Sequence, residues 1–172
     1  MNISERIKND SQRSIYQKYA VQLEPFDVIE FGKALGLEVK ESDTMPARVS
    51  GLITKIDGKY VICVNKSESI QRKRFTVAHE IGHYLLHSDQ FGDGLVDSVD
   101  SLNRDGRAHA IEYEANDFAA NLLMPERRFR MLWEDQTSSV VVIATFFLVS
   151  DSAVMIRAKS LGLAKGSSDY FA

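Results

Sequence analysis

Two histidines and a glutamate lie close together in the pattern His79-Glu80-x-x-His83. Apolar side chains recur at helical spacing from Phe75 to Leu86, which predicts a buried helix. Residues four apart on a helix share a face, with Cβ atoms about 5–6 Å apart, so both imidazoles can bind one ion. Glu80 projects from the same turn and can act as a base toward a water at that ion. The alternative is a chance copy of the motif, which would not be expected to come with an apolar face or a third ligand.

A third ligand is expected from the next helix, predicted over residues 109–123. Its apolar positions recur at spacings of four, three and four, and this stripe must face the core. Glu112 and Asn116 each follow a stripe residue, whereas Glu114 groups with polar residues on the solvated face. The periodicity therefore selects Glu112, although a carboxylate at such a boundary can also simply form a salt bridge. The stripe consists of Ile111, Ala115, Phe118 and Leu122.

Two further histidines are weaker candidates for the site. His87 lies two turns from His79, about 12 Å along the helix axis, so these two cannot converge on one ion. We expect His87 to end its helix and interact with the helix dipole. His109 shares a helix face with Glu112 and Asn116, so it is either a donor close to the site or an exposed residue near the helix start.

The chain has 172 residues, of which 44% are hydrophobic and 26% charged, and this is enough for one soluble domain with a buried site. A net charge of −3 argues against a nucleic-acid surface as the main function. The single cysteine, Cys63, excludes an internal disulfide and fits a reducing compartment. The polar N-terminus does not resemble a signal peptide, and the longest apolar run, residues 140–149, is too short to cross a bilayer. We therefore expect a cytoplasmic protein without membrane association.

The elements that must position the site indicate an α+β fold. One weakly amphipathic helix is expected over residues 3–19, a second after Pro25, and a short strand over 37–40. Segments 49–56 and 59–64 flank Asp57-Gly58, a strong hairpin signal. We predict a mostly helical domain with a small antiparallel sheet or hairpin packed on the helix that carries His79. The hairpin has two interpretations of equal weight: an edge strand that pairs with a substrate backbone, or plain scaffold.

Three shorter helices are predicted at the C-terminal end, over residues 125–134, 139–147 and 151–161. The last two resemble a helix-turn-helix, for which the functional interpretation is DNA recognition. Direct nucleic-acid binding is disfavoured, because the second of them offers only Arg157 and Lys159 as cations in an acidic chain. We expect residues 1–165 to form a single domain, with helices 139–162 packed as part of it, and residues 166–172 to form a disordered tail.

Two segments carry a family resemblance: Phe75-Thr76-x-Ala78-His79-Glu80-x-Gly82-His83, and Glu112-x-x-Ala115-Asn116-x-Phe118-Ala119-x-x-Leu122-Leu123-Met124-Pro125. Together they resemble the ImmA/IrrE family of zinc-dependent metallopeptidases, over roughly residues 25–163. The resemblance implies a zincin-like fold with a gluzincin-like site. In that site His79, His83 and Glu112 bind one zinc ion, Glu80 is the general base, and Asn116 orients a ligand. Manganese, iron or cobalt could replace zinc according to availability.

The resemblance also implies a regulatory role. Members of this family typically relieve repression by cleaving or otherwise inactivating a helix-turn-helix repressor, often encoded beside them in phage, mobile-element, stress-response or toxin–antitoxin-like loci. We therefore expect an intracellular endopeptidase whose partner is such a repressor. The alternatives are a protein-binding regulator that uses the same fold without catalysis and, less favoured, a DNA-binding regulator acting through residues 140–161.

Overall fold

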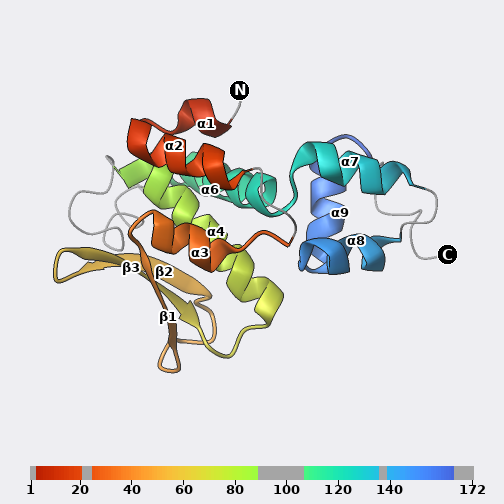
Figure 1. Cartoon of the computed structure of the whole chain (residues 1–172). Coiled ribbons are helices and arrows are strands. Elements are labelled where there is room, and N and C mark those ends of the chain that lie inside the picture. The colour runs from red at the N-terminus through yellow and green to blue at the C-terminus, as the bar shows by residue number, and fades with distance from the viewer. Residues whose placement is uncertain (1–2, 21–24, 89–106, 136–138, 165–172) are drawn as a thin grey trace.

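Helix α4 (Ile70–His87) runs through the middle of the computed structural model and carries the His-Glu-x-x-His motif (Figure 1). The structure describes residues 3–20, 25–88, 107–135 and 139–164, so the tail predicted at 166–172 lies outside the described residues. Helix α6 (Arg107–Leu123) packs along α4 in the most extensive contact between any two described elements. These two helices form the frame of the candidate site.

A three-stranded sheet covers the side of α4 away from α6 (Figure 1). Strands β2 (Gly51–Ile56) and β3 (Lys59–Asn65) form the predicted antiparallel hairpin, and both turn residues, Asp57 and Gly58, have positive φ as such a tight turn requires. Strand β1 (Glu38–Ser42) pairs with the other side of β3 in parallel, giving the order β1-β3-β2. The sheet is therefore mixed and not purely antiparallel as expected, because pairing direction depends on a tertiary chain path that periodicity does not record.

The N-terminal segment forms two helices where one was predicted. Helix α1 (Ile3–Arg6) is separated from α2 (Asp10–Tyr19) by a break at which Asn9 accepts a hydrogen bond from the backbone N–H of Gln12. This side-chain cap competes with continuation of the helix. The Arg13 guanidinium donates to the Ile7 carbonyl at 3.0 Å, which satisfies a backbone acceptor that the break exposes. The prediction of a single helix over residues 3–19 was wrong for this local reason.

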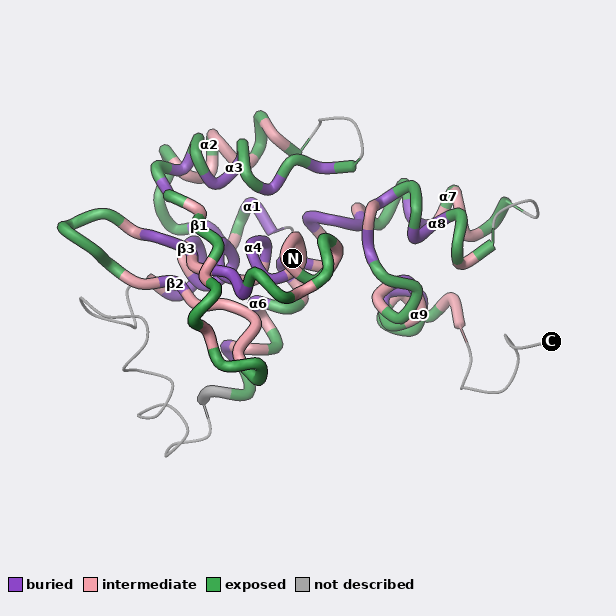
Figure 2. The backbone as a smooth tube through the Cα atoms, turned by 90° about the horizontal axis from the view of Figure 1, so that it is seen from below, coloured by how far each residue is buried: buried purple, intermediate pink, exposed green. Residues whose placement is uncertain are grey.

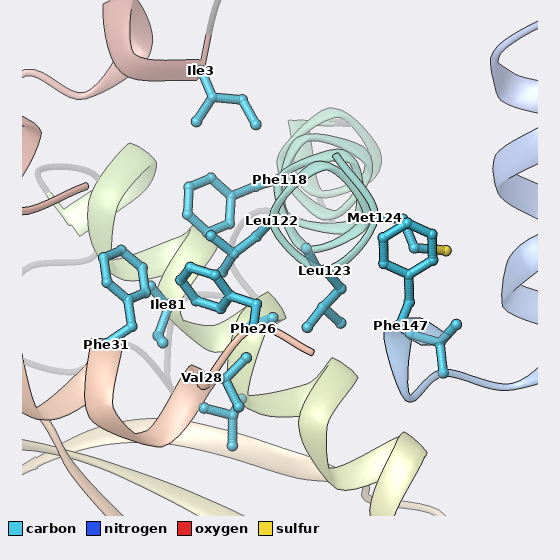
Figure 3. Close-up of a cluster of buried hydrophobic side chains, with 14 of the residues drawn as sticks. Ile3, Phe26, Val28, Phe31, Ile81, Phe118, Leu122, Leu123, Met124 and Phe147 are labelled. Carbon is cyan, nitrogen blue, oxygen red and sulfur yellow. The ribbon is translucent and has the colours of Figure 1, made fainter. Parts of the chain in front are cut away.

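The hydrophobic core lies where α3 (Val28–Ala34), α4 and α6 meet (Figure 3). Phe31 from α3, Ile81 from α4 and Phe118 from α6 are all fully buried there. Figure 2 shows buried residues concentrated along α4, whereas α2 has none. The stripe predicted for α6 is confirmed, since Ile111, Ala115, Phe118 and Leu122 are all buried.

Helices α7 (Glu126–Glu134), α8 (Val140–Phe147) and α9 (Asp151–Ser160) form a separate group at one end of α6 (Figure 1). Leu148, in the left-handed conformation, ends α8, and Ser150 caps α9 through the N–H of Ala153, so the predicted short turn is confirmed. Arg157 joins this group to the rest by donating hydrogen bonds to the Met124 carbonyl and to Asn121. Among the described helices none is long and apolar enough by itself to cross a membrane, although α8 and α9, bent by 100°, pass that length and composition test as a pair.

Candidate metal centre

Three side chains converge between α4 and α6. The Nε2 atoms of His79 and His83 are 3.0 Å apart, and the two carboxylate oxygens of Glu112 each lie 3.3 Å from one of them. The ring planes of the two histidines are nearly perpendicular, at 83°. Helix α4 supplies both imidazoles at i and i+4, and α6 brings the carboxylate across, because the residue before it, Ile111, is buried in the core.

The donor set fits a small divalent cation. A tetrahedral ion with bonds of about 2.0–2.1 Å holds its ligand atoms about 3.3–3.4 Å apart. The separations of 3.0 and 3.3 Å among the two nitrogens and the Glu112 oxygens are close to that value. Two imidazoles and one carboxylate also leave a fourth position open. The three residues predicted as ligands are therefore brought together in a geometry that can hold a metal.

His79 is oriented from its far side. Its Nδ1 lies 3.0 Å from Asn116 Oδ1, so the ring donates from Nδ1 and leaves Nε2 free to face Glu112. The ring of Phe75 stacks on that of His79 at a centroid distance of 6.4 Å. The structure thus places Asn116 where it can fix the His79 ring, as the family resemblance implies for it. Phe75, which the sequence analysis treated only as part of the apolar face, packs beside the same ligand.

Glu80 is buried between α4 and the sheet. Its side chain is 8% exposed, and the backbone N–H of Ile53 on β2 hydrogen-bonds its carboxylate. Burial raises the pKa of Glu80 despite the opposing influence of His79 and His83. A raised pKa makes this carboxylate a stronger base, which suits a group that takes up a proton and later returns it.

The candidate ligands shift one another's pKa values. In the metal-free protein, rings of His79 and His83 that carry a proton on Nε2 donate hydrogen bonds to Glu112, which keep the pKa of this carboxyl well below its usual range, so it is ionised. Burial by itself would lower the pKa of His79, but its hydrogen bond to Glu112 and the charges of Glu80 and Glu112 outweigh burial, and the net shift is upward. The site therefore has a fixed negative group beside its two imidazoles, which favours a cation.

His87 is the last residue of α4, as predicted, but its side chain makes buried contacts that the prediction of a dipole interaction did not include. It is 1% exposed, with Nδ1 3.4 Å from His83 Nδ1 and Nε2 3.0 Å from Glu114 Oε2. Glu114 was expected on the solvated face of α6, but its side chain reaches α4. It also forms an ion pair with Arg6, in which Nη2 lies 3.0 Å from Glu114 Oε2. Burial lowers the pKa of His87, and the hydrogen bond from His87 lowers that of Glu114. The four-residue spacing from His83 was the signal that could have found this contact, but His87 was considered only as a rival ligand to His79.

His109 is not brought to the ligands. It is an exposed residue near the start of α6, and none of the described hydrogen bonds or ion pairs joins it to His79, His83 or Glu112. Its alternative interpretation, a surface histidine, agrees better with this placement.

A cleft of about 650 Å³ opens beside the centre, between the first half of α4, the middle of α6 and helix α9. Phe75 and Asn116, both in contact with His79, form part of its wall, so the cleft lies next to the candidate metal site. Tyr113 and Ile156 also line it and are 72% and 68% exposed. Large apolar side chains that remain exposed at such a cleft are typical of binding surfaces.

Among folds that bind a divalent cation, a buried His-Glu-x-x-His helix with a carboxylate from the next long helix and a small sheet behind it is the arrangement of zincin-like metallopeptidases. The chain belongs to the family of the IrrE N-terminal-like domain, peptidase family M78, whose model matches residues 33–159. The resemblance seen in the two sequence segments is thereby confirmed.

Three similar proteins help to place the chain. It is 42% identical over 66 residues to a radiation response metalloprotease, IrrE, of Deinococcus radiodurans, a match that covers 38% of this chain and 20% of the relative. The IrrE of Deinococcus deserti is 43% identical over 74 residues, covering 40% and 26%. A solved structure of a transcriptional regulator from Mycobacterium tuberculosis matches with a TM-score of 0.63 and 22% identity over 87% of this chain and 44% of that one. The matches therefore span only 20% and 26% of the length of these curated relatives, and the solved structure supports the fold alone.

Proposed function

We propose that this protein is a cytoplasmic zinc endopeptidase that regulates transcription by cleaving a helix-turn-helix repressor. The observation that carries the proposal is the convergence of His79, His83 and Glu112 on one point, with the buried carboxylate of Glu80 on the same turn of α4. Zinc is the ion that two imidazoles and a carboxylate with an open fourth position favour, although other divalent metals can occupy such a site.

The chemistry divides between the ion and the chain. When bound, the ion supplies Lewis acidity, which lowers the pKa of water and polarises the scissile carbonyl. Glu80 takes the proton of the attacking water on a carboxylate oxygen and later gives it to the departing amine. Its raised pKa suits both steps. Asn116 keeps the His79 ring in the orientation that presents Nε2, and Phe75 packs against the same ring.

The surroundings suggest how a polypeptide would lie in the site. Strand β2 is at an edge of the sheet, and its Ile53 backbone touches Glu80, so an extended substrate that paired with β2 would pass the general base. Of the two interpretations of the hairpin, this favours the substrate-binding edge over plain scaffold. The cleft next to Phe75 then offers space for the apolar side chains of such a substrate.

The regulatory part of the proposal draws on relatives. Two of them are described as radiation response metalloproteases, and the similar solved structure is described as a transcriptional regulator. A repressor with a helix-turn-helix, encoded near this gene, is the substrate that the family resemblance favours.

The test compares wild type with Glu80→Gln, using zinc analysis and incubation with the repressor encoded nearest the gene. We expect about one zinc per chain in both proteins and discrete fragments, identified by mass spectrometry, with wild type only. Glu134→Gln, an exposed glutamate on α7, is the matched control and should cut normally. A cutting Glu80→Gln variant would show that Glu80 is not the base. Loss of DNA binding by the repressor without fragments would support the non-catalytic binding regulator, and failure of wild type to take up zinc would remove the catalytic proposal.

A further inference from the structure

We propose that His87 is a positioning residue for the metal ligand His83, as the second member of a hydrogen-bonded chain His83–His87–Glu114–Arg6. This inference rests on metal binding by His83, which is part of the proposed function, but it does not depend on peptide cleavage. The chain links three helices, since His83 and His87 belong to α4, Glu114 to α6 and Arg6 to α1.

The first step is the orientation of the His83 ring. Its Nε2 faces Glu112 Oε1 at 3.3 Å and His79 Nε2 at 3.0 Å, so Nε2 is the nitrogen on the metal side. Its Nδ1 points the other way, 3.4 Å from His87 Nδ1. Two ring nitrogens that face each other can hydrogen-bond only if one carries a proton and the other does not.

The second step decides which nitrogen carries it. His87 Nε2 lies 3.0 Å from Glu114 Oε2, and an ionised carboxylate only accepts hydrogen bonds, so His87 Nε2 is the donor. A neutral His87 with its proton on Nε2 has a bare Nδ1. That Nδ1 must accept from His83 Nδ1–H. His83 is thereby held in the tautomer whose Nε2 lone pair is free for a cation.

Glu114 is itself held in place by Arg6. Arg6 Nη2 lies 3.0 Å from the same Oε2 atom that His87 contacts, and Arg6 Nη1 lies 3.5 Å from Asp117. The guanidinium therefore keeps Glu114 charged and turned toward α4. His87 is 1% exposed, so bulk water does not compete with its hydrogen bonds. The two metal-side histidines thus have different supports, an exposed amide for His79 and a buried imidazole for His83.

The tautomers can be observed directly in the folded wild-type chain. We would load full-length, nitrogen-15-labelled protein with zinc and record long-range proton–nitrogen correlation spectra of the histidine rings. The expected pattern is His83 protonated at Nδ1 and His87 protonated at Nε2 with a bare Nδ1. A His87 protonated at Nδ1, or at both nitrogens, would overturn the inference.

Two substitutions test the consequence for metal binding. His87→Leu removes the acceptor and the donor, whereas His87→Gln keeps one of each. By competition with a chelator, we expect zinc affinity to fall about 10–100-fold in His87→Leu and less than about tenfold in His87→Gln. His109→Leu, the same change at an exposed histidine, should bind as wild type does.

Each outcome separates this inference from its rivals. Affinity of His87→Leu equal to that of the control, or equal losses in both His87 variants, would show that His87 acts only as core packing. If a variant does not fold, the wild-type spectra decide alone. If zinc binds and the tautomers are as expected but no repressor is cut, the proposed function fails while the positioning role of His87 stands. If wild type binds no zinc, both fail.

Discussion

At the scale of single residues, Glu80 is held in an environment that disfavours its charge. Burial raises its pKa above the value of 4.5 usual for a free glutamate, so the folded state holds this proton more tightly than the unfolded state does. The stability of the folded protein therefore falls as the pH rises from the pKa of a free glutamate through the folded-state pKa. Above that pH the metal-free protein contains a buried, destabilising carboxylate. The proposed general base therefore carries a stability cost in the absence of metal, a pattern common at functional sites.

We predict that Glu80→Gln stabilises the metal-free protein at neutral pH. The melting temperature should rise by about 2–4 °C, which corresponds to about 1 kcal/mol in a domain of this size. The difference in melting temperature should shrink as the pH falls toward the pKa of a free glutamate, because residue 80 is then neutral in both proteins. Circular dichroism melts of chelator-treated protein at several pH values measure it, with Glu134→Gln as the exposed control. A wild type that is more stable than Glu80→Gln at neutral pH would refute the assignment of a buried charge.

The sequence was informative about residues whose signal is local. Spacing on one helix pointed to His79 and His83, and the apolar stripe of α6 selected Glu112, and the structure brings these three side chains together. The catalytic role of Glu80 stays a prediction. The sequence pattern did not show that Glu114 also reaches α4, because a polar side chain at the edge of a helix face can point either to solvent or to a neighbouring helix. That choice depends on His87 and Arg6 approaching from other helices, and no periodicity within α6 contains it.

At the scale of elements, the contact between α4 and α6 sets how far Glu112 lies from the histidines. Gly82 allows that contact, because a Cβ at this position would lie 3.1 Å from Phe118 Cδ1 and 3.3 Å from the Cα of Ala115. The glycine costs α4 about 1 kcal/mol of helix propensity, but it lets two backbones come together one residue before His83. The pairing of ligands from two helices depends on this close approach.

Gly82→Ala should therefore push α6 away from α4. We predict a net loss of about 1–2 kcal/mol of stability, because overpacking outweighs the gain in helix propensity. Zinc affinity should fall as well, since Glu112 moves with α6. Gly32→Ala is the matched control, because its Cβ would meet only ordinary contacts at 3.6 and 3.7 Å and the change should be neutral or stabilising. Denaturant unfolding and chelator competition measure both effects, and equal behaviour of the two variants would contradict the close-approach argument.

Helices and the hairpin were largely predictable as elements, but their arrangement was not. Apolar periodicity and capping residues located α4, α6 and α9, and Asp57-Gly58 located the hairpin turn. The parallel pairing of β1 with β3 was missed, since it joins residues more than twenty positions apart through tertiary contacts. The break at Asn9 was missed for a different reason: its capping signal was present, but the longer apolar pattern was given more weight.

At the scale of the whole molecule, helices α8 and α9 are attached to the metal-binding frame through Arg157. This residue is 3% exposed and donates to Asn121 in the last turn of α6 at 2.7 Å and to the carbonyl of Met124, just after that helix, at 3.2 Å. Of the two cations in α9, Arg157 is thus turned inward, and Lys159 stays exposed. The single domain expected over residues 1–165 stays a prediction, and the inward position of Arg157 gives little support to DNA recognition.

Arg157→Met separates attachment of these helices from metal binding. It keeps an unbranched apolar stem of the side chain but removes the guanidinium, which leaves the Met124 carbonyl and Asn121 without their donor, so we predict a loss of about 1–3 kcal/mol. Zinc content should not change, because the three candidate ligands lie on α4 and α6. Lys159→Met, an exposed change on the same helix, should affect neither quantity. Unfolding in urea together with zinc analysis makes the measurement. If Arg157→Met lost zinc and stability together, the C-terminal helices would be part of the scaffold that holds the metal site, and the frame of α4 and α6 would not suffice to form it.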